Sequence, residues 1–521
     1  MLTYILKTIL SLSFVFASMA SICKCIHMLQ LNSYQYAGYF RTVFRIRSYF
    51  IPYFFMCVFA LPIALCLSAE SIALPVISVI FVLFGLVRKP DKYAKKKLVY
   101  TMRVKRLVIT NLCLCAIACA GIFLLKSETL FRLLPIVFYA LTPFITLLAN
   151  LINTPMEKAI NRHYINDAKR ILRSSGVNTI GITGSYGKTS VKFYLSALLT
   201  EKYDTLCTPS SFNTPLGIVR TIRSSLTPLT EVFVCEMGAR HVHDIKKICD
   251  IVHPDCAVIT AIGNQHLETF HTLENIKKTK LELADAVEKK CKGHVFINSD
   301  SVCDAASLPY SDIITYGTNE NADYMAHNIR FSEKGMSFTV TCFGKESMDF
   351  TTRLLGSHNA VNLTGAIAVA HTYGISLESL SPRVRRIAPV EHRQELRPMQ
   401  GGVIIDDAFN SNPVGAKSAL DTLSCFDACK ILITPGMVEL GSAEWELNKE
   451  FGKQAAAVCD YVFLVGRTHT ESIYEGLKEA GFNENRITVS PSFSDAMAQA
   501  QVMRTEKKKA ILIENDLPDN Y

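Results

Sequence analysis

The stretch from Asn178 to Ser190, NTIGITGSYGKTS, decides the fold of this 521-residue chain. Its first half is a short apolar run rich in β-branched residues, which predicts a buried strand. A glycine-rich turn follows, and the residues behind it continue in a helical pattern. The backbone amides of such a turn and the amino end of the helix together form a site for phosphate. The stretch therefore predicts an α/β fold that binds a nucleotide.

Two side chains of this loop have a defined role in phosphate chemistry. Lys188 is placed to reach terminal phosphates, and the Thr189 hydroxyl is placed to ligate Mg²⁺. The spacing is T-G-x-x-G-K-T, which differs from the common phosphate-loop pattern because Ile182 stands five residues before Gly187. A plain glycine turn with a chance lysine is the alternative. The candidate nucleotide-binding residues are Thr183, Gly184, Ser185, Tyr186, Gly187, Lys188, Thr189 and Ser190.

Short apolar runs alternate with helical stretches through the rest of the chain. The predicted strands are Thr179–Thr183, Val232–Glu236, Ala257–Ala261, His294–Asn298, Val403–Asp406, Ile431–Thr434, Tyr461–Val465, Ile487–Ser490 and Ala510–Ile513. The segment GISLESLSP, Gly374–Pro382, is interpreted as an interdomain linker. We therefore expect a central P-loop-type ATPase domain at 177–378 and a C-terminal Rossmann-like open-sheet domain at 379–521.

The chain before residue 153 has a different composition. Five apolar stretches are about as long as a bilayer requires. They are Thr3–Ile22, Tyr49–Leu67, Ser71–Val87, Leu107–Leu125 and Leu130–Ile152. We expect a multi-spanning helical membrane segment at 1–152, with four or five spans because the second and third can form a re-entrant hairpin. Residues 153–176 are expected to be a linker.

Charge indicates the orientation of this segment. The connection at 88–106 carries nine Lys or Arg residues, and the connection at 23–48 is basic as well. Basic loops stay in the cytoplasm, which places the N-terminus outside and everything after residue 153 in the cytoplasm. The predicted location is the cytoplasmic (inner) membrane, multi-pass, with a lipid bilayer as partner.

Composition excludes other classes of protein. The chain has a net charge of +9, but this excess lies among the apolar spans, so it does not indicate nucleic-acid binding. The seventeen cysteines lack metal-binding spacing and fit a reducing compartment.

Three further residues are candidates for metal chemistry. Glu236 ends a predicted buried strand, and His266 follows the next strand. Lys280 lies on the same helical face as Ile276 and Leu283, where an ammonium is costly unless its charge is paired or removed. Snorkelling of Lys280 to solvent is the alternative.

Five segments follow one another in an order that resembles the Mur ligase family. They are the phosphate-loop variant, VCEMGA, ITAIGNQHLETF, LLGSHNAVNLTGAIAVA and DDAFNSNP. The resemblance covers about residues 177–521, and GMVELG is closest to the branch that adds D-alanyl-D-alanine. It implies that Glu236 and His266 help to hold Mg²⁺. It also implies that Lys280 is carbamylated, so that Lys188, His266 and Lys280 are the catalytic candidates and Thr189, Glu236, His266 and Lys280 the metal candidates.

The same resemblance implies roles for residues farther along the chain. Asn359 and Asn362 would lie beside the adenosine, and helix capping is their other possible role. Arg393 and Asp407 would approach ATP when the C-terminal domain closes. The substrate candidates are Asn213, Thr214, Asn410 and Asn412.

The function that follows from the resemblance is an ATP- and Mg²⁺-dependent ligase. It would join a cell-wall peptide precursor to an amino acid or dipeptide amine through an acyl phosphate. Two departures concern the substrate: the membrane segment stands where the family has its UDP-sugar domain, and the chain closes with LIENDLPDNY in place of a Lys-Gly-Ser-Arg-like segment. The alternatives are a ligase for a lipid-linked or poly-γ-glutamate-type peptide, and a transporter or assembly subunit with a cytoplasmic ATPase.

Overall fold

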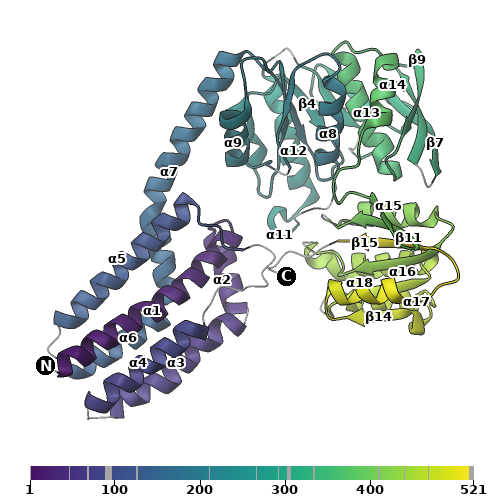
Figure 1. The fold of residues 1–521 in the computed structure, drawn as a ribbon. Coiled ribbons are helices and arrows are strands. Elements are labelled where there is room, and N and C mark those ends of the chain that lie inside the picture. The colour runs from purple at the N-terminus through teal and green to yellow at the C-terminus, as the bar shows by residue number, and fades with distance from the viewer. Residues whose placement is uncertain are drawn as a thin grey trace. The chain divides into compact units, whose positions relative to one another are not determined.

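The chain divides into two compact units in the computed structural model, Met1–His163 and Tyr164–Leu517 (Figure 1). Each unit is described by itself. The structure describes residues 2–45, 47–66, 70–87, 97–124, 127–210, 212–263, 265, 267–290, 293–301, 307–332, 335–408, 411–438, 440–467 and 469–515.

The first unit is built from helices. They are α1 (Leu2–Leu31), α2 (Tyr36–Arg45), α3 (Arg47–Cys66), α4 (Glu70–Val87), α5 (Met102–Leu124), α6 (Glu128–Ala140) and the first part of α7 (Thr142–Ser175). By length and composition, α1 and the Met102–Gly121 part of α5 can cross a membrane, and α6 with α7 makes a third crossing if this pair is one span. The described apolar parts of α3 and α4, Tyr53–Cys66 and Ile72–Val87, are shorter.

Two sequence expectations differ from the structure around α6 and α7. The single span expected at 130–152 is broken, because α6 and α7 meet at an angle of 70°. The break lies beside Pro143, which lacks the backbone donor that a continuous helix requires. The segment 153–176, expected as a linker, is helical, because α7 continues to Ser175.

Ion pairs and hydrogen bonds show which ends of these helices lie together. Lys7 at the start of α1 pairs with Glu128 at the start of α6, at 2.6 Å. At the other end of α1, the Gln30 amide donates to the Val99 carbonyl at 2.8 Å and accepts from the Val99 amide at 2.9 Å. Residues 7 and 128 therefore share one end of the bundle, and residues 30 and 99 share the other.

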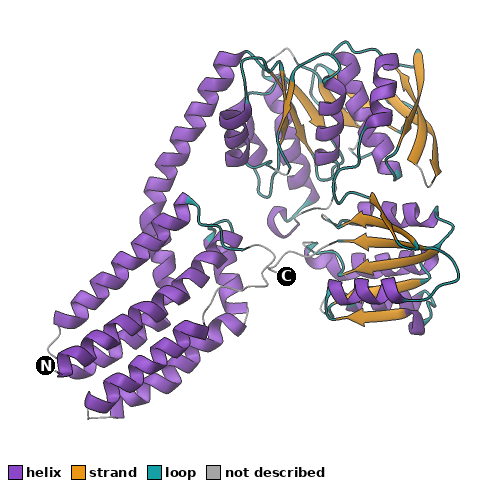
Figure 2. Cartoon of the chain, in the orientation of Figure 1, coloured by secondary structure: helices purple, strands orange, loops and turns teal. Residues whose placement is uncertain are grey.

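The second unit contains strands, drawn as orange arrows in Figure 2. Its first sheet has nine strands in the order β2-β3-β1-β4-β5-β6-β7-β8-β9. The strands are parallel up to β7, and the last two pairings are antiparallel. The bounds are β1 (Asn178–Thr183), β2 (Thr205–Cys207), β3 (Val232–Glu236), β4 (Cys256–Ile259), β5 (Val295–Asn298), β6 (Ile313–Gly317), β7 (Tyr324–Ser332), β8 (Gly335–Cys342) and β9 (Glu346–Thr352).

Helices cover both faces of this sheet and bury two separate apolar cores. One core contains apolar side chains of α8 (Lys188–Leu199), α13 (Ser357–Thr372) and α14 (Leu377–Arg386). The other contains side chains from the end of α7 and from α9 (Pro215–Ser225), α10 (Asp244–Val252) and α12 (Leu273–Glu288). The short helix α11 (Leu267–Phe270) precedes α12. The parallel strands end at one edge of the sheet, where the phosphate loop follows β1.

The segment expected to be an interdomain linker, Gly374–Pro382, is instead mostly part of α14. Ser376 caps this helix by accepting a hydrogen bond from the Ser379 amide. Leu377 and Leu380 are fully buried in the core that α8 and α13 also form. Serine and proline in the segment suggested a loop, but here serine is a helix cap and Pro382 lies late in the helix.

The C-terminal part of the unit is a second sheet in the order β10-β11-β15-β12-β13-β14, with only β10 antiparallel among its described pairings. The strands are β10 (Glu395–Met399), β11 (Gly402–Asp407), β12 (Cys429–Thr434), β13 (Tyr461–Val465), β14 (Ile487–Ser490) and β15 (Lys509–Glu514). The helices α15 (Pro413–Ser424), α16 (Glu444–Val458) and α17 (Glu471–Glu479) share one core, and α18 (Phe493–Val502) contributes to the other. The prediction of an α/β protein is confirmed.

We predict that Leu380→Ala destabilises the central domain, because it removes a fully buried side chain from its core. The expected loss is about 2–5 kcal/mol in the free energy of unfolding, measured by urea titration of the purified chain. Arg385→Ala, at an exposed position of the same helix, is the control. Equal stability of the two variants would contradict the packing of α14.

Candidate functional site

The phosphate loop has no room for side chains at its two glycines. Gly184 has φ +153° and Gly187 has φ +81°. A Cβ at Gly184 would lie 2.0 Å from Thr260 Oγ1, and a Cβ at Gly187 would lie 2.5 Å from Asn362 Oδ1. The backbone of the loop therefore packs closely against Thr260 and against Asn362 of α13.

The amides of the loop are not all available for a ligand. Those of Ser185 and Tyr186 donate to the Ala261 carbonyl, at 2.7 and 3.2 Å. At the amino end of α8, the amides of Lys188, Thr189 and Ser190 have no carbonyl one turn earlier in the helix to bond, whereas the Val191 amide donates to the Gly187 carbonyl at 2.9 Å. An anion-binding role for the loop therefore rests on the start of α8 and on side chains, rather than on every loop amide.

Lys188 lies folded against the loop that precedes it. Its Nζ donates to the carbonyls of Gly184 and Ser185, at 2.7 and 2.9 Å. Burial lowers the pKa of Lys188 to about 8, Glu236 opposes this shift, and Arg393 adds to it. The side chain thus supplies a positive charge at neutral pH in a site with little competing water.

Glu236, at the end of β3, receives hydrogen bonds from three side chains, two on α8 and one in the loop that follows β2. The Thr189 hydroxyl donates to Oε1 at 3.1 Å, and the Asn213 amide donates to the same oxygen at 2.9 Å. Lys192 pairs with Oε2 at 3.0 Å. The structure therefore brings together three predicted residues, Thr189, Glu236 and Asn213.

Lys192 is a site residue that the sequence analysis missed. Its side chain is fully buried on α8, one turn after Lys188. Lys192, Leu195 and Leu199 are spaced by three and four residues and therefore follow one face of the helix. A lysine on an apolar face was the signal, the same one that singled out Lys280.

The oxygen atoms at Thr189 and Glu236 suit Mg²⁺. A hydroxyl and a carboxylate are the oxygen ligands that Mg²⁺ prefers, and it commonly takes one or two protein ligands beside phosphates and water. No group of three or more His, Cys, Asp or Glu residues able to hold a metal occurs in the described part of the chain. His266, a metal candidate from the sequence, lies outside the described residues.

Lys280 is buried near Lys188. Its side chain is about 2% exposed, and burial holds its pKa well below the usual range, with repulsion from Lys188 as the next cause. Asp244 and Glu282 act in the opposite direction. The Lys280 side chain therefore does not extend into solvent, so the snorkelling alternative is wrong.

The two asparagines of α13 are buried at the phosphate-loop side of that helix. Asn359 accepts a hydrogen bond from the Tyr194 hydroxyl at 2.9 Å and donates to the Leu355 carbonyl at 2.6 Å. Asn362 lies against Gly187. Both residues thus shape the nucleotide loop from α13, and Asn359 acts through α8.

A second polar group lies where β11 and β15 end. Burial raises the pKa of Asp407 to about 6, and nearby Arg393 opposes the shift. Asp407 is paired in register with Glu514, whose pKa is raised well above its usual range by burial and by Asp407. The Ser411 hydroxyl donates to Glu514 at 2.5 Å. Arg393 also interacts electrostatically with Glu236 and with Asp407. It therefore interacts with the polar group around Glu236 as well as with this second group.

Two of the substrate candidates have structural roles as helix caps. Thr214 accepts from the Gly217 amide at the start of α9, at 3.3 Å. Asn412 accepts from the Gly415 amide at the start of α15, at 2.9 Å. Asn410 lies outside the described residues.

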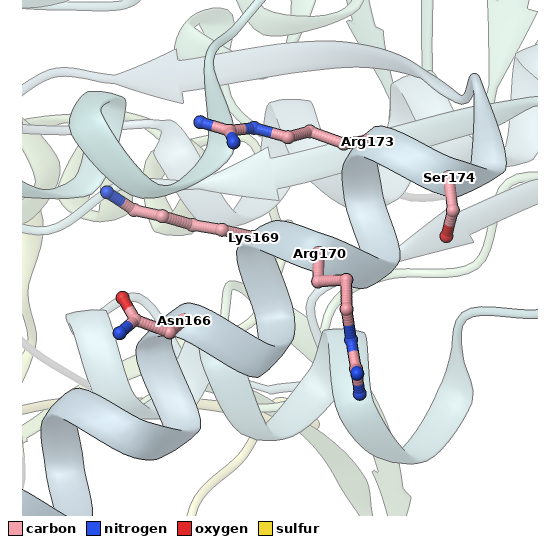
Figure 3. Close-up of a pocket in the computed structure, with 5 residues that line it drawn as sticks. All are labelled: Asn166, Lys169, Arg170, Arg173 and Ser174. Atoms are coloured by element: carbon pink, nitrogen blue, oxygen red, sulfur yellow. The ribbon is translucent and has the colours of Figure 1, made fainter.

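One cavity, of about 620 Å³, lies away from these residues (Figure 3). Asn166, Lys169, Arg170, Arg173 and Ser174 line it near the end of α7. These residues precede β1, whereas the phosphate loop follows that strand, so the cavity lies toward the opposite edge of the sheet. Arg173 lies in the last turn of α7, where the helix dipole favours a cation, and Arg170 pairs with Asp167 at 2.7 Å.

The two sheets and the phosphate loop match known protein families. A model of the Mur ligase middle domain matches residues 182–370, and a model of the Mur ligase glutamate ligase domain matches residues 392–514. The two matches cover more than half of the chain. The chain belongs to the Mur ligase family, whose members are ATP-dependent ligases, and this confirms the predicted enzyme class.

Several relatives identify the branch of the family. The UDP-N-acetylmuramoyl-tripeptide--D-alanyl-D-alanine ligase of Bacillus subtilis (strain 168) is 32% identical over 62% of this chain and 69% of its own length. The ligase of the same name from Escherichia coli (strain K12) is 29% identical over 58% of this chain and 67% of its own length. These similarities confirm the prediction of a MurF-type Mur ligase.

Solved structures share the fold. MurF from Acinetobacter baumannii has a TM-score of 0.62 and 22% identity, covering 69% of this chain and 78% of that chain. MurF ligase from Thermotoga maritima in complex with ADP has a TM-score of 0.60 and 21% identity, covering 84% of this chain and 88% of that chain.

We predict that ADP binding weakens as the pH rises through about 8. The lowered pKa of Lys188 means that its ammonium is charged below about pH 8 and loses its proton above it. Isothermal titration between about pH 7 and 9.5 should show affinity falling by up to about tenfold per pH unit above the pKa. Lys188→Arg keeps the charge and should flatten the curve, and identical curves for both proteins would contradict the assignment.

Proposed function

We propose that this chain adds D-alanyl-D-alanine to a UDP-linked muramoyl-tripeptide, with ATP and Mg²⁺. The named relatives support this substrate pair. The observation that carries the proposal is the Glu236 carboxylate, which is bonded to the nucleotide loop through Thr189 and to the expected substrate loop through Asn213. The Glu236 carboxylate thus connects the nucleotide side of the site to the substrate side, and a ligase must align these two sides.

The roles of the residues follow from their charge and position. When bound, ATP supplies the phosphoryl group that activates the carboxylate of the peptide precursor. Lys188 and the first amides of α8 bind the phosphate oxygens and neutralise their charge. Thr189 and Glu236 would hold Mg²⁺, with His266 as a further candidate ligand. Arg393 and Asp407 complete the nucleotide site, and Asn359 and Asn362 support the adenosine side. Positioning and exclusion of water are the main contributions of the protein.

Lys280 is proposed to act as a carbamate. Its lowered pKa favours the neutral amine, which is the form that adds CO₂. The ammonium loses one proton to become the neutral amine, and addition of CO₂ to Nζ releases a second, so that an anionic oxygen ligand would replace the buried ammonium. Near Lys188, that change converts repulsion between two lysines into attraction.

The helical unit is proposed to anchor the enzyme in the cytoplasmic membrane with its catalytic domains in the cytoplasm. The apolar helices support this location, and so does the placement of residues 7 and 128 at one end and 30 and 99 at the other. Val99 lies within the basic segment 88–106, whose described cations, Lys97, Arg103, Lys105 and Arg106, are close to it along the chain, and such charge is expected on the cytoplasmic side.

A lipid-linked peptide is the second candidate for the precursor. The observation that favours it is the direct passage from the apolar unit through α7 to β1, without an intervening α/β domain. The chemistry at the phosphate loop would be the same, and only the carrier of the carboxylate would differ.

The proposed reaction is tested by phosphate release from Mg-ATP by the detergent-solubilised chain. UDP-muramoyl-tripeptide and a lipid-linked equivalent are each supplied with and without D-alanyl-D-alanine. We expect release to require both a precursor and the amine, and to be lost in Lys188→Ala and Lys280→Ala. Lys345→Met, an exposed lysine in the β8–β9 turn, should be fully active. Steady hydrolysis that is indifferent to the amine would refute the ligase and favour a transporter or assembly ATPase.

The proposed membrane orientation predicts protection from protease. In spheroplasts, protease added outside should leave residues 164–515 intact, whereas inverted membrane vesicles should lose them. The chain should also stay with the membrane after alkaline extraction. Digestion in intact spheroplasts would place the catalytic domains on the wrong side for cytoplasmic ATP.

A further inference from the structure

Lys192 is the most completely buried charged side chain of the candidate site, with 0% exposure. Its Nζ pairs with Glu236 Oε2 at 3.0 Å and donates to the Ser210 carbonyl. A buried ammonium in these bonds cannot also bind a solvent-borne ligand. Lys192 must therefore act by positioning the groups to which it is bonded.

Those groups are Glu236, at the end of β3, and Ser210, in the loop at 208–214 that follows β2 and contains the substrate candidate Asn213. The Glu236 amide donates to Thr208 Oγ1 at 3.1 Å, and the Gly238 amide donates to the Asn213 carbonyl at 2.8 Å. Ser210 has φ +43°, an unusual conformation for a residue with a side chain. Its carbonyl is the one that Lys192 binds. The loop is thus held to the end of β3 at Thr208 and Asn213, and to Lys192 of α8 at Ser210.

The contact made by Lys192 differs from the others because it originates on α8. This helix begins at Lys188 and contains Thr189, so its position is tied to the phosphate loop. Lys192 therefore connects the helix that binds phosphate to the loop on the substrate side. Without Lys192, Glu236 would be a buried carboxylate with only neutral donors, and Ser210 would lose the bond that holds its strained backbone.

We propose that Lys192 is a positioning residue that sets the 208–214 loop relative to the phosphate loop and thereby determines affinity for the peptide precursor. This inference rests on the proposed function, because it concerns the precursor of that same site. It assigns a role to a fully buried lysine through its bonds to Glu236 and Ser210.

The test is Lys192→Met, which keeps an unbranched side chain one atom shorter and removes its charge. With the full-length solubilised chain, we expect the KM for the precursor to rise on the order of tenfold or more, while the KM for ATP changes by less than about threefold. Hydrogen–deuterium exchange should become faster in residues 208–214. Lys345→Met is the matched control, and Lys192→Arg should restore part of the exchange protection because it keeps the charge.

A second variant reaches the same loop without altering Lys192. A Cβ at Gly238 would lie 2.7 Å from Asn213 Cγ, so Gly238→Ala should displace Asn213 and raise the precursor KM in the same way. Unchanged loop exchange and unchanged precursor KM in folded Lys192→Met would overturn the proposal. So would an equal rise of both KM values. If Lys192→Met does not fold, Gly238→Ala decides, and an unchanged precursor KM overturns the proposal. Absence of wild-type turnover would refute the proposed function, while the exchange measurement would still report on the loop.

Discussion

The candidate site depends on the buried carboxylate of Glu236 and its three donors. Thr189, Lys192 and Asn213 come from α8 and from the 208–214 loop, and each bonds to the end of β3. A buried carboxylate is stable only where such partners surround it. The same bonds fix the phosphate loop, the helix behind it and the substrate-side loop relative to one another. Removal of this one group would leave each of those segments with an unsatisfied polar atom.

Positive charge is concentrated around the carboxylate. Lys188 and Lys280 repel each other, and Arg393 lowers the pKa of Lys188 further. Such an arrangement is unfavourable for folding, because each buried ammonium loses its hydration. It is suited to a polyphosphate, whose negative charges replace the missing water. The buried positive charges that lower the stability of the site therefore favour binding of a nucleotide. Lys192 is the exception, because it is paired with Glu236 and stabilises the fold around the site.

Much of the second unit could be predicted because its signals are local. The strands at Val232–Glu236 and Tyr461–Val465 were predicted to the residue, since each is a short apolar run bounded by polar residues. The antiparallel strands β7 to β9 were missed, because buried and more exposed residues alternate along them. Polar residues on the outer face interrupt the continuous apolar runs from which the other strands were predicted. The helix α14 was missed because its serines and proline have the composition of a loop, and only packing of Leu377 and Leu380 shows otherwise.

The sequence by itself determined the class of this protein: the phosphate loop, the alternation of strands and helices, and the apolar stretches before residue 153. These depend on neighbouring residues, whose spacing is visible along the chain. Only the tertiary structure decided the partners of Glu236, which are separated from it by 47, 44 and 23 residues. It also decided that Thr214 and Asn412 cap helices and that Lys192 is buried. Such roles depend on which segments meet in space, and spacing along the chain does not contain that information.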